Sequence, residues 1–398
     1  MKTTYIIDAV RTPIGKYAGA LSSVRPDDLA ALVIKALLER NPNIDVNEIE
    51  DVIFGNANQA GEDNRNVARM ALLLAGLPVK VGGNTVNRLC ASGMQAIIDA
   101  SRAISVGDGG IYIAGGTENM TRAPFVMAKS ESAFSRSHEI YDTTIGWRFT
   151  NKKLAELYHP FSMGETAENV AAQWKISRDA QDEFAFSSQE KYIAAHATNK
   201  FAEEIIPVPI PQKKGELKYF EIDEHPRKTS IEELAKLKPA FKKDGTVTAG
   251  NASGLNDGAA ALFLASEDAV KKYNLKPIAK VVSRAVAGID PAIMGIGPVP
   301  ATQKAVSRAG LKMNDIGLFE LNEAFASQSL ACISDLQIDP AIVNVNGGAI
   351  ALGHPLGCSG ARISTTLIHE MQKRNIKYGV ATMCIGVGQG ATVVFEKV

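Results

Sequence analysis

The sequence lacks an excess of charge of either sign, since 43 basic and 43 acidic residues balance within 398. Proteins whose main partner is a nucleic acid or an acidic membrane surface usually carry a basic surplus. Long apolar runs are missing as well, and no stretch reaches the roughly 20 apolar residues of a membrane span. We therefore expect neither nucleic acid nor a membrane as a partner.

The sequence also lacks targeting signals. Its first twelve residues, MKTTYIIDAVRT, are too polar for a secretory signal peptide because Asp8 interrupts the apolar run. Its last four residues, FEKV, match no peroxisomal or endoplasmic-reticulum address. We expect a cytoplasmic protein.

Cysteine is scarce, with four residues at Cys90, Cys332, Cys358 and Cys384. No two of them form a CxxC pair, which argues against a zinc ribbon or a thioredoxin-type site. Wide spacing of cysteines in a long chain fits a reducing compartment.

The residues that are present are typical of a globular α/β protein. Hydrophobic residues make up 45% and charged residues 22%, and the length suggests two or three domains. Apolar strand patterns at 4–10, 49–57 and 109–120 alternate with helical patterns such as 27–40. This alternation predicts sheets covered by helices.

The last third of the chain repeats the order of the first. The strand patterns at 316–325 and 378–390 correspond to those at 50–59 and 109–119. We predict a duplicated fold, whose halves bring the ends of their functional strands to one cleft. The predicted division is 1–121 plus 247–275 for the first half, 122–246 for an insertion, and 276–398 for the second half. Within the insertion, Pro- and Lys-rich residues 208–228 favour exposed loops.

Two cysteines and a histidine stand in settings that suit catalysis. Cys90 comes just before an apolar helical pattern, where the helix dipole and free N–H groups stabilise a thiolate. His354 lies in a glycine-rich loop and is fixed by Pro355, so it can accept a proton from a thiol. Cys384 ends a strand that runs into glycines, whose N–H groups can form an oxyanion hole. The alternative for all three is a purely structural role.

The other candidates are weaker on local context. Asn322 and Glu323 end a buried strand and could point into a ligand crevice, or could form a turn or helix cap. We interpret Cys358 as a small residue that fills space in its loop and Cys332 as a core residue of a helix. The glycine runs do not give the GxGxxG pattern of a dinucleotide site.

Four segments together resemble the thiolase family: NRLCASGMQA at 87–96, NEAFA at 322–326, GGAIALGHPLGCSGAR at 347–362 and CIGVGQG at 384–390. They occur in the family's order and span most of the chain. The resemblance implies a thiolase fold with five layers, α-β-α-β-α, built from two similar halves and an inserted loop domain. It implies an acyltransferase that acts on CoA thioesters, with coenzyme A as a substrate and no metal or bound cofactor.

The resemblance also implies the role of each catalytic residue. Cys90 is the nucleophile that carries the acyl group as a thioester, and His354 activates it. Cys384 exchanges a proton with the CoA thiol or with the α-carbon of acetyl-CoA. Asn322 holds a water that, with His354, stabilises the enolate oxygen, and the N–H groups of Cys90 and Gly386 hold the thioester oxygen.

Binding residues are implied less directly. Ser253, in VTAGNASGLNDGAAA, matches a CoA-contacting serine of the family. Further residues fall in segments that contact CoA or line the acyl pocket in relatives: Met163, Arg227, Leu237, Phe241, Met294 and Phe325. Because thiolases are usually dimers or tetramers, we expect a homodimer or a homotetramer.

The substrate class is indicated by segments outside the catalytic motifs. Ser162 stands where short-chain biosynthetic members commonly carry a histidine, and segments 20–29, 58–70, 122–137 and 140–149 resemble β-ketoadipyl-CoA thiolases. These enzymes split 3-oxoadipyl-CoA into succinyl-CoA and acetyl-CoA. A distal carboxylate needs a cation, for which Arg136 and Arg148 are candidates. Alternatives are a 3-ketoacyl-CoA thiolase of fatty-acid β-oxidation and an acetoacetyl-CoA thiolase.

Three other functional classes remain open from the residues alone. A decarboxylating condensing enzyme shares the fold but pairs its cysteine with His–His or His–Asn, so Cys384 favours a thiolase. A cysteine hydrolase with a Cys–His dyad would need neither Cys384 nor a CoA-sized insertion. A non-catalytic CoA-binding protein would not need the intact catalytic set.

Overall fold

A computed structural model describes residues 2–136, 138–212 and 215–398 of the chain. Before the insertion its elements are β1 (Thr4–Arg11), β2 (Gly15–Lys16), α1 (Pro26–Arg40), β3 (Asp51–Gly55), α2 (Val67–Leu74), β4 (Gly82–Val86), α3 (Ser92–Val106) and β5 (Ile111–Asn119). After it they are β10 (Asn256–Ser266), α8 (Glu267–Lys272), β11 (Ala279–Gly288), α9 (Pro298–Arg308), β12 (Leu318–Leu321), α10 (Ala326–Leu336), α11 (Ala349–Leu352), α12 (Leu356–Arg374), β13 (Tyr378–Ile385) and β14 (Gln389–Lys397).

The predicted duplication is present in the strand order. The first half is ordered β3-β5-β10-β1 and the second β12-β13-β14-β11, and β4 lies beyond β3 at the edge. Corresponding neighbours pair in the same sense, parallel for β3–β5 and β12–β13, and antiparallel for the others. Even the register shift recurs, between Ile6 and Asp8 in β1 and between Val281 and Ser283 in β11.

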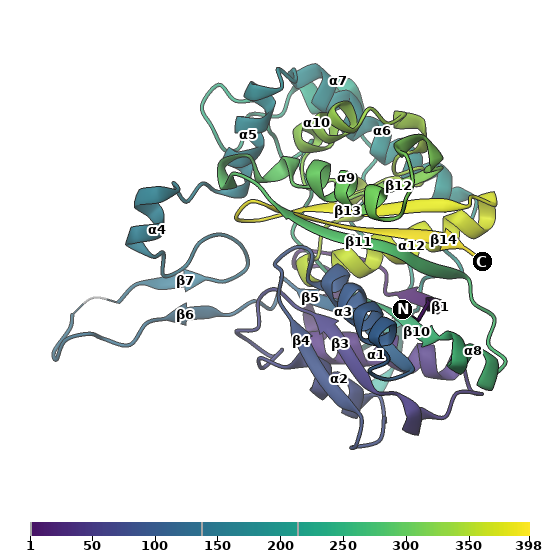
Figure 1. Cartoon of the computed structure of the whole chain (residues 1–398). Helices are drawn as coiled ribbons and strands as arrows, with labels where there is room; N and C mark the ends of the chain where they lie inside the picture. The colour runs from purple at the N-terminus through teal and green to yellow at the C-terminus, as the bar shows by residue number, and fades with distance from the viewer. Residues whose placement is uncertain (1, 137, 213–214) are drawn as a thin grey trace.

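The two halves form five layers, as predicted (Figure 1). Helices α3 and α12 pack on each other and contact strands of both halves, so they form the central layer. Helices α1 and α2 cover the outer face of the first half, and α9, with α10 packed on it, covers the second. Each of the two interlayer spaces outside the centre holds its own apolar core, and a third core surrounds α3 and α12.

Glycines allow the two central helices to approach closely. A methyl group on Gly93 of α3 would lie 2.7 Å from the carbonyl oxygen of Gly357 in α12. One on Gly360 would lie 2.3 Å from the backbone nitrogen of Met94. No side chain fits at these distances. The N-terminal ends of both helices are therefore held together, and these ends carry Cys90 and the His354 loop.

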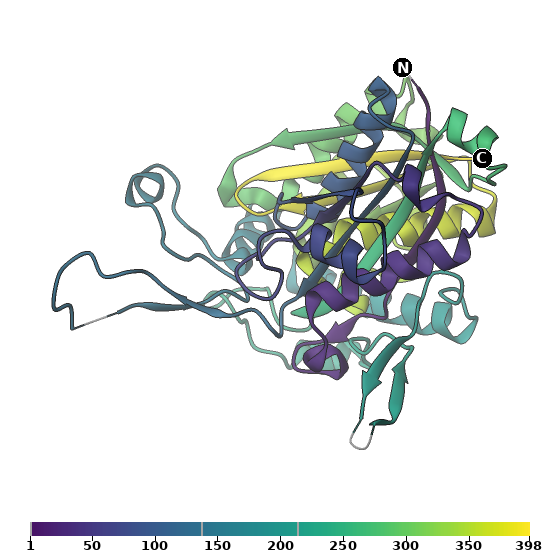
Figure 2. The ribbon, with the colours of Figure 1, turned by 90° about the horizontal axis from the view of Figure 1, so that it is seen from below.

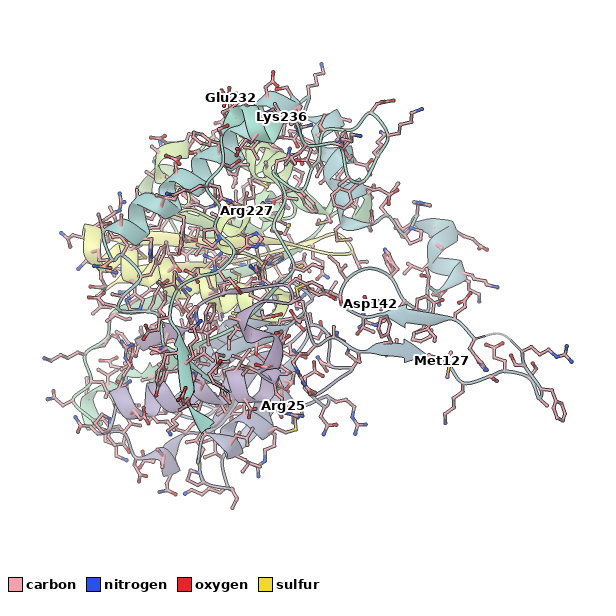
Figure 3. The ribbon with its side chains drawn as sticks, turned by 180° about the vertical axis from the view of Figure 1, so that it is seen from behind. Arg25, Met127, Asp142, Arg227, Glu232 and Lys236 are labelled. Carbon is pink, nitrogen blue, oxygen red and sulfur yellow. The ribbon has the colours of Figure 1, made fainter. Side chains whose placement is uncertain are left out.

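The insertion contributes β6 (Phe125–Met127), β7 (Ile140–Asp142), α4 (Lys152–Leu157), α5 (Met163–Gln173), α6 (Arg178–Ala197), β8 (Val208–Pro211), β9 (Leu217–Phe220) and α7 (Ile231–Ala235). The β6–β7 hairpin projects from the body as an arm, with α4 beside it (Figures 1 and 2). Met127 lies out on this arm, far from Arg227 on the body (Figure 3). No helix in the described part of the chain is long and apolar enough to cross a membrane.

The prediction of exposed loops over 208–228 was wrong for β8 and β9, which form an antiparallel hairpin. Residues 213 and 214 of that segment lie outside the described residues. Proline suggested a loop because it cannot donate a ladder hydrogen bond. In an isolated two-stranded hairpin both strands are edges, so Pro209 and Pro211 are tolerated.

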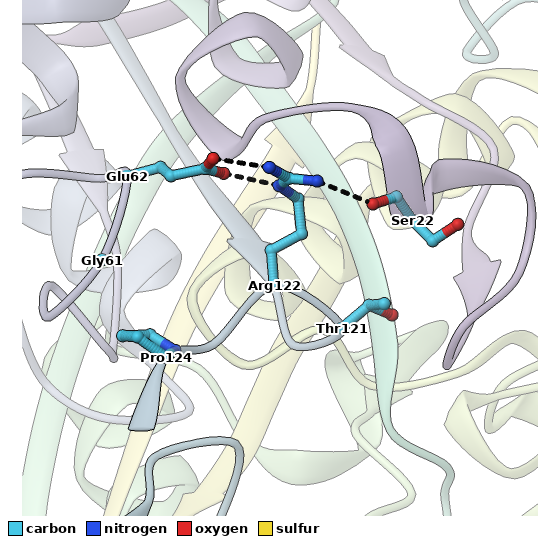
Figure 4. A pocket seen from close by; sticks show the side chains of 6 residues that line it. All are labelled: Ser22, Gly61, Glu62, Thr121, Arg122 and Pro124. Carbon is cyan, nitrogen blue, oxygen red and sulfur yellow. Dashed lines mark hydrogen bonds and ion pairs between the residues drawn. The ribbon is translucent and has the colours of Figure 1, made fainter. Parts of the chain in front are cut away.

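The root of the arm is fastened to the first half by an ion pair. The Arg122 guanidinium donates to both carboxylate oxygens of Glu62 at 2.5 Å and to the Ser22 carbonyl oxygen at 3.0 Å (Figure 4). Bidentate geometry of this kind fixes direction as well as distance. The insertion therefore leaves the body along a defined path.

Candidate active site

Cys90 sits on a strained turn directly before α3. Leu89 has a φ of +47°, which is uncommon for a residue other than glycine. The turn is held by Ser92, whose hydroxyl accepts from the Arg88 N–H at 2.9 Å and donates to the Leu89 carbonyl at 2.6 Å. This backbone leaves the Cys90 side chain half-buried at the end of the helix. Strain of this kind collects at functional positions.

The backbone N–H groups of Gly386 and of Cys90 itself lie near the Cys90 sulfur and act to lower its pKa. Gly386 directly follows β13, in a turn where Val387 has a φ of +62° and Gly388 a φ of +78°. Burial raises the pKa of Cys90 to about 11, although both N–H groups act to lower it. Donors placed here could also hold the oxygen of a carbonyl bonded to this sulfur.

His354 is a buried base with a defined tautomer. The Ser359 hydroxyl donates to the Pro355 carbonyl at 2.8 Å and lies 2.6 Å from His354 Nδ1, so it accepts the Nδ1 proton. Nε2 is then left as the proton acceptor. The His354 N–H also donates to Asn256 at 2.9 Å. Burial, helped by the charge of Arg362, lowers the pKa of His354 to about 3, so the ring is neutral at physiological pH.

Asn322 follows β12 and lies against the His354 ring. Its Nδ2 is 3.4 Å from Nδ1 and 3.5 Å from Nε2 of His354. Its Oδ1 is buried and has no hydrogen-bond partner within the described residues. An unpartnered buried oxygen fits an ordered water. Glu323, in contrast, has a structural role, because its carboxylate accepts hydrogen bonds from Ser188, Asn344 and Ile350.

Cys384 is buried on β13, one residue before its end. Burial, and then the charge of Cys90, raise the pKa of Cys384. Met294 and Phe325, which were predicted to line the pocket, pack with Cys384 in one apolar cluster, and Met163, from a segment predicted to contact CoA, packs against it. The other two cysteines, Cys332 and Cys358, are fully buried in apolar cores.

Within the predicted catalytic set, Asn322 and His354 are in contact, and Cys90 and Cys384 are linked by the effect of the Cys90 charge on the pKa of Cys384. In the described part of the chain no hydrogen bond joins the Cys90 sulfur to the His354 ring directly. Without substrate, catalytic hydrogen bonds are often long. The Asn322 N–H donates a hydrogen bond to the Thr382 carbonyl at 3.0 Å, which joins Asn322 to the strand that carries Cys384.

The predicted CoA residues lie around Phe325. The Ser253 N–H donates to the Ala324 carbonyl at 3.0 Å. The Phe241 ring meets Phe325 edge-on at 6.2 Å and is still 42% exposed. Leu237 is 38% exposed, and exposed apolar side chains of this kind suit a ligand surface. The Arg227 guanidinium donates to the Ala249 carbonyl at 3.2 Å.

A cavity of about 270 Å³ opens at Cys90, and Met163, Gly386 and Val387 line it. Arg148 lines the same cavity from the insertion, whereas Arg136 does not. Arg136 lies exposed in the loop between β6 and β7, away from Cys90. Within the ranges that the structure describes, no group of three His, Cys, Asp or Glu side chains is placed to hold a metal.

Comparison with known proteins decides the family. Models of the thiolase N-terminal and C-terminal domains match residues 4–268 and 275–397. The chain belongs to the thiolase family. It is 57% identical to a beta-ketoadipyl-CoA thiolase of Pseudomonas putida over 401 residues and 55% identical to a 3-oxoadipyl-CoA/3-oxo-5,6-dehydrosuberyl-CoA thiolase of Escherichia coli, with both chains of each pair fully covered. A structure of human mitochondrial 3-ketoacyl-CoA thiolase in complex with CoA matches with a TM-score of 0.92 and 42% identity, covering 100% of this chain and 98% of that one.

Sequence reasoning missed one residue of this thiolase site, Glu118. Its carboxylate is buried at the end of β5 and lines the Cys90 cavity. It accepts from the N–H groups of Ala57 and Gly357 at 2.8 Å, and of Asn58 at 3.2 Å. Burial raises the pKa of Glu118 to about 7. The available signal was an acidic residue in GGTEN, at the end of a buried strand, where the ligand crevice of an α/β fold lies.

Proposed function

We propose that this thiolase cleaves 3-oxoadipyl-CoA with CoA to give succinyl-CoA and acetyl-CoA. The observation that carries the proposal is identity of 55–57% over the full length to enzymes named for this substrate. Arg148, in the cavity at Cys90, supports this substrate, because a straight-chain acyl group has no carboxylate to pair with the guanidinium. A fatty-acid 3-ketoacyl-CoA thiolase and an acetoacetyl-CoA thiolase are the alternatives.

In the first half-reaction the Cys90 sulfur attacks the C3 ketone while its proton passes to Nε2 of His354. A concerted transfer fits the raised pKa of Cys90 and the lowered pKa of His354. The C2–C3 bond then breaks and its electron pair forms the enolate of acetyl-CoA. We propose that a water on Asn322, with His354, stabilises the enolate oxygen, and that Cys384 protonates C2. Acetyl-CoA leaves and Cys90 holds a succinyl thioester.

In the second half-reaction the thiol of incoming CoA gives its proton to the Cys384 thiolate and attacks the succinyl thioester. The N–H groups of Cys90 and Gly386 hold the oxygen of the tetrahedral intermediate. When the intermediate collapses, the Cys90 sulfur leaves and recovers its proton from His354. Coenzyme A is thus a substrate, and the cycle uses no bound cofactor.

Two further features of the proposal concern the whole protein. We propose a homo-oligomer, because strand β4 is an open sheet edge whose residues are all at least partly exposed. We propose a cytoplasmic location, which the four free cysteines support.

The test compares kcat/KM for CoA-dependent cleavage of 3-oxoadipyl-CoA, acetoacetyl-CoA and 3-oxodecanoyl-CoA. We expect kcat/KM for 3-oxoadipyl-CoA to exceed that for either other substrate by more than tenfold, and a tenfold ratio corresponds to about 1.4 kcal/mol of transition-state free energy. A preference for either straight-chain substrate would overturn the substrate assignment and leave the family intact. Mass measurement of the protein after incubation with succinyl-CoA should find the succinyl group on Cys90.

A further inference from the structure

Arg148 occupies the wall of the Cys90 cavity that the insertion supplies. It is half-buried and lies between β7 and α4, in the segment 143–148, every residue of which lines the cavity. The cavity therefore joins a nucleophilic sulfur from the first half to a guanidinium from the insertion. In a 3-oxoadipyl group, two methylenes separate the attacked ketone from the distal carboxylate. A cation that binds this carboxylate must line the same cavity as the sulfur, and Arg148 does.

The backbone that carries Arg148 is fixed before any ligand binds. Asn58 donates to the Thr143 carbonyl at 3.1 Å and to its hydroxyl at 3.0 Å. The Thr143 hydroxyl donates to the Pro124 carbonyl at 2.6 Å. On the other side, the Trp147 indole donates to the Phe161 carbonyl at 3.0 Å. With the segment held at Thr143 and at Trp147, less freedom of the loop is lost when Arg148 binds an anion.

Arg148 has no anionic partner in the part of the chain that the structure describes. The carboxylate that lines the cavity, that of Glu118, already accepts hydrogen bonds from backbone N–H groups. Neighbouring arginines are engaged elsewhere: Arg122 pairs with Glu62, and Arg88 donates to Gln95 and Gln389. A half-buried guanidinium without a partner is a ready receptor for a carboxylate, which it can bind with two parallel hydrogen bonds.

We propose that Arg148 forms the subsite for the distal carboxylate of the substrate and so selects dicarboxylic 3-oxoacyl groups over methyl-ended ones. The inference rests on the proposed function, since it names the residue that reads the adipyl end. The acetyl-CoA half of the reaction does not use this subsite. Arg148 therefore controls which acyl group reaches Cys90 and takes no part in proton transfer.

The experiment uses two substrates that differ only at the far end. 3-Oxoadipyl-CoA carries a carboxylate where 3-oxohexanoyl-CoA carries a methyl group. We expect Arg148→Ala to lower kcat/KM for 3-oxoadipyl-CoA by about 10- to 100-fold, mainly through KM, since a contact made equally in ground and transition states acts on binding. For 3-oxohexanoyl-CoA we expect less than about a threefold change. Arg148→Lys should recover part of the adipyl activity.

Arg136→Ala is the matched control, because it removes the same charge from the same insertion outside the cavity. It should leave both substrates unchanged. Equal loss for both substrates in Arg148→Ala would mean that Arg148 only supports the loop, and unchanged kinetics would mean that it does not bind substrate; either result overturns the inference. If the wild-type enzyme itself does not prefer 3-oxoadipyl-CoA, the proposed function fails instead.

Discussion

The carboxylate of Glu118 accepts a hydrogen bond from the backbone N–H of Gly357 at 2.8 Å. This bond joins the end of β5 to the first turn of α12, three residues after His354. The same oxygen accepts from the Ala57 N–H, on the loop that follows β3. One buried side chain thus fixes three segments around Cys90, and it places the histidine loop relative to the nucleophile.

Glu118→Gln should therefore impair catalysis through geometry. A glutamine amide would turn one N–H₂ group toward backbone donors that now face an oxygen. A buried mismatch of this kind costs about 1–3 kcal/mol. We expect kcat to fall by roughly 10- to 100-fold with a smaller change in KM, measured as thiolysis of the preferred substrate. Glu267→Gln, in the exposed ion pair with Lys271, should leave kcat unchanged. An unaltered kcat in Glu118→Gln would refute the positioning role.

Removing the second sulfur should separate the two half-reactions. Cys384→Ala takes away the group that protonates C2, so C–C cleavage should fall by about 10²- to 10⁴-fold, the usual range for a lost general acid. Acylation of Cys90 by succinyl-CoA should persist, because a CoA thiolate leaves without help from a strong acid. Rapid-quench mass spectrometry of the protein would follow acylation of Cys90 by 3-oxoadipyl-CoA, which requires C–C cleavage, and by succinyl-CoA, which does not. Loss of acylation together with cleavage would contradict the assigned role, and Cys358→Ala, in the core, serves as the control.

The pH dependence of Cys90 alkylation follows from its raised pKa. With a pKa of about 11, the thiolate is a small fraction at neutral pH and grows tenfold for each pH unit until pH 11 is approached. The rate of iodoacetamide labelling should therefore rise about tenfold from pH 7 to 8 and again from 8 to 9. A plateau below pH 8 would instead indicate a thiolate paired with a protonated His354. Labelling should vanish in Cys90→Ala, because the remaining three cysteines are buried.

The sequence predicted correctly those features that depend on short segments, namely the order of the strands and the positions of two cysteines at the ends of elements. The duplicated strand order follows from apolar periodicity and glycine turns, whereas the five layers were implied by the family resemblance, and the comparisons confirm the family. The positions of Cys90 before α3 and of Cys384 at the end of β13 were likewise readable from short segments. The catalytic roles of these residues stay predictions.

The sequence did not predict which side chains from distant segments meet at the cavity. Arg136 and Arg148 lie in the same polar insertion, and composition cannot distinguish them; only the path of the segment between β7 and α4 brings one of them to the cavity. Glu118 was missed because its partners, Ala57 and Gly357, are 61 and 239 residues away in the sequence. Such contacts depend on the packing of whole layers.

The turn beside the Cys90 sulfur offers a test of stored strain. Val387 adopts a φ of +62°, and for a β-branched residue this conformation is a genuine outlier that costs about 1–2 kcal/mol. It is 41% exposed, so little packing is lost when it is replaced. Asparagine tolerates the left-handed region, so Val387→Asn should stabilise the protein by about 1 kcal/mol in denaturant unfolding.

The same substitution bears on activity, because Val387 lines the cavity and directly follows Gly386. Because asparagine adopts the same left-handed backbone, the Gly386 N–H should keep its place near the Cys90 sulfur, and we expect kcat to stay unchanged while stability rises. Val79→Asn is a suitable control, since Val79 is 79% exposed and remote from the cavity. Equal stability in Val387→Asn and wild type would mean that the left-handed valine carries no strain, and a large loss of kcat at raised stability would mean that the valine at this position serves catalysis.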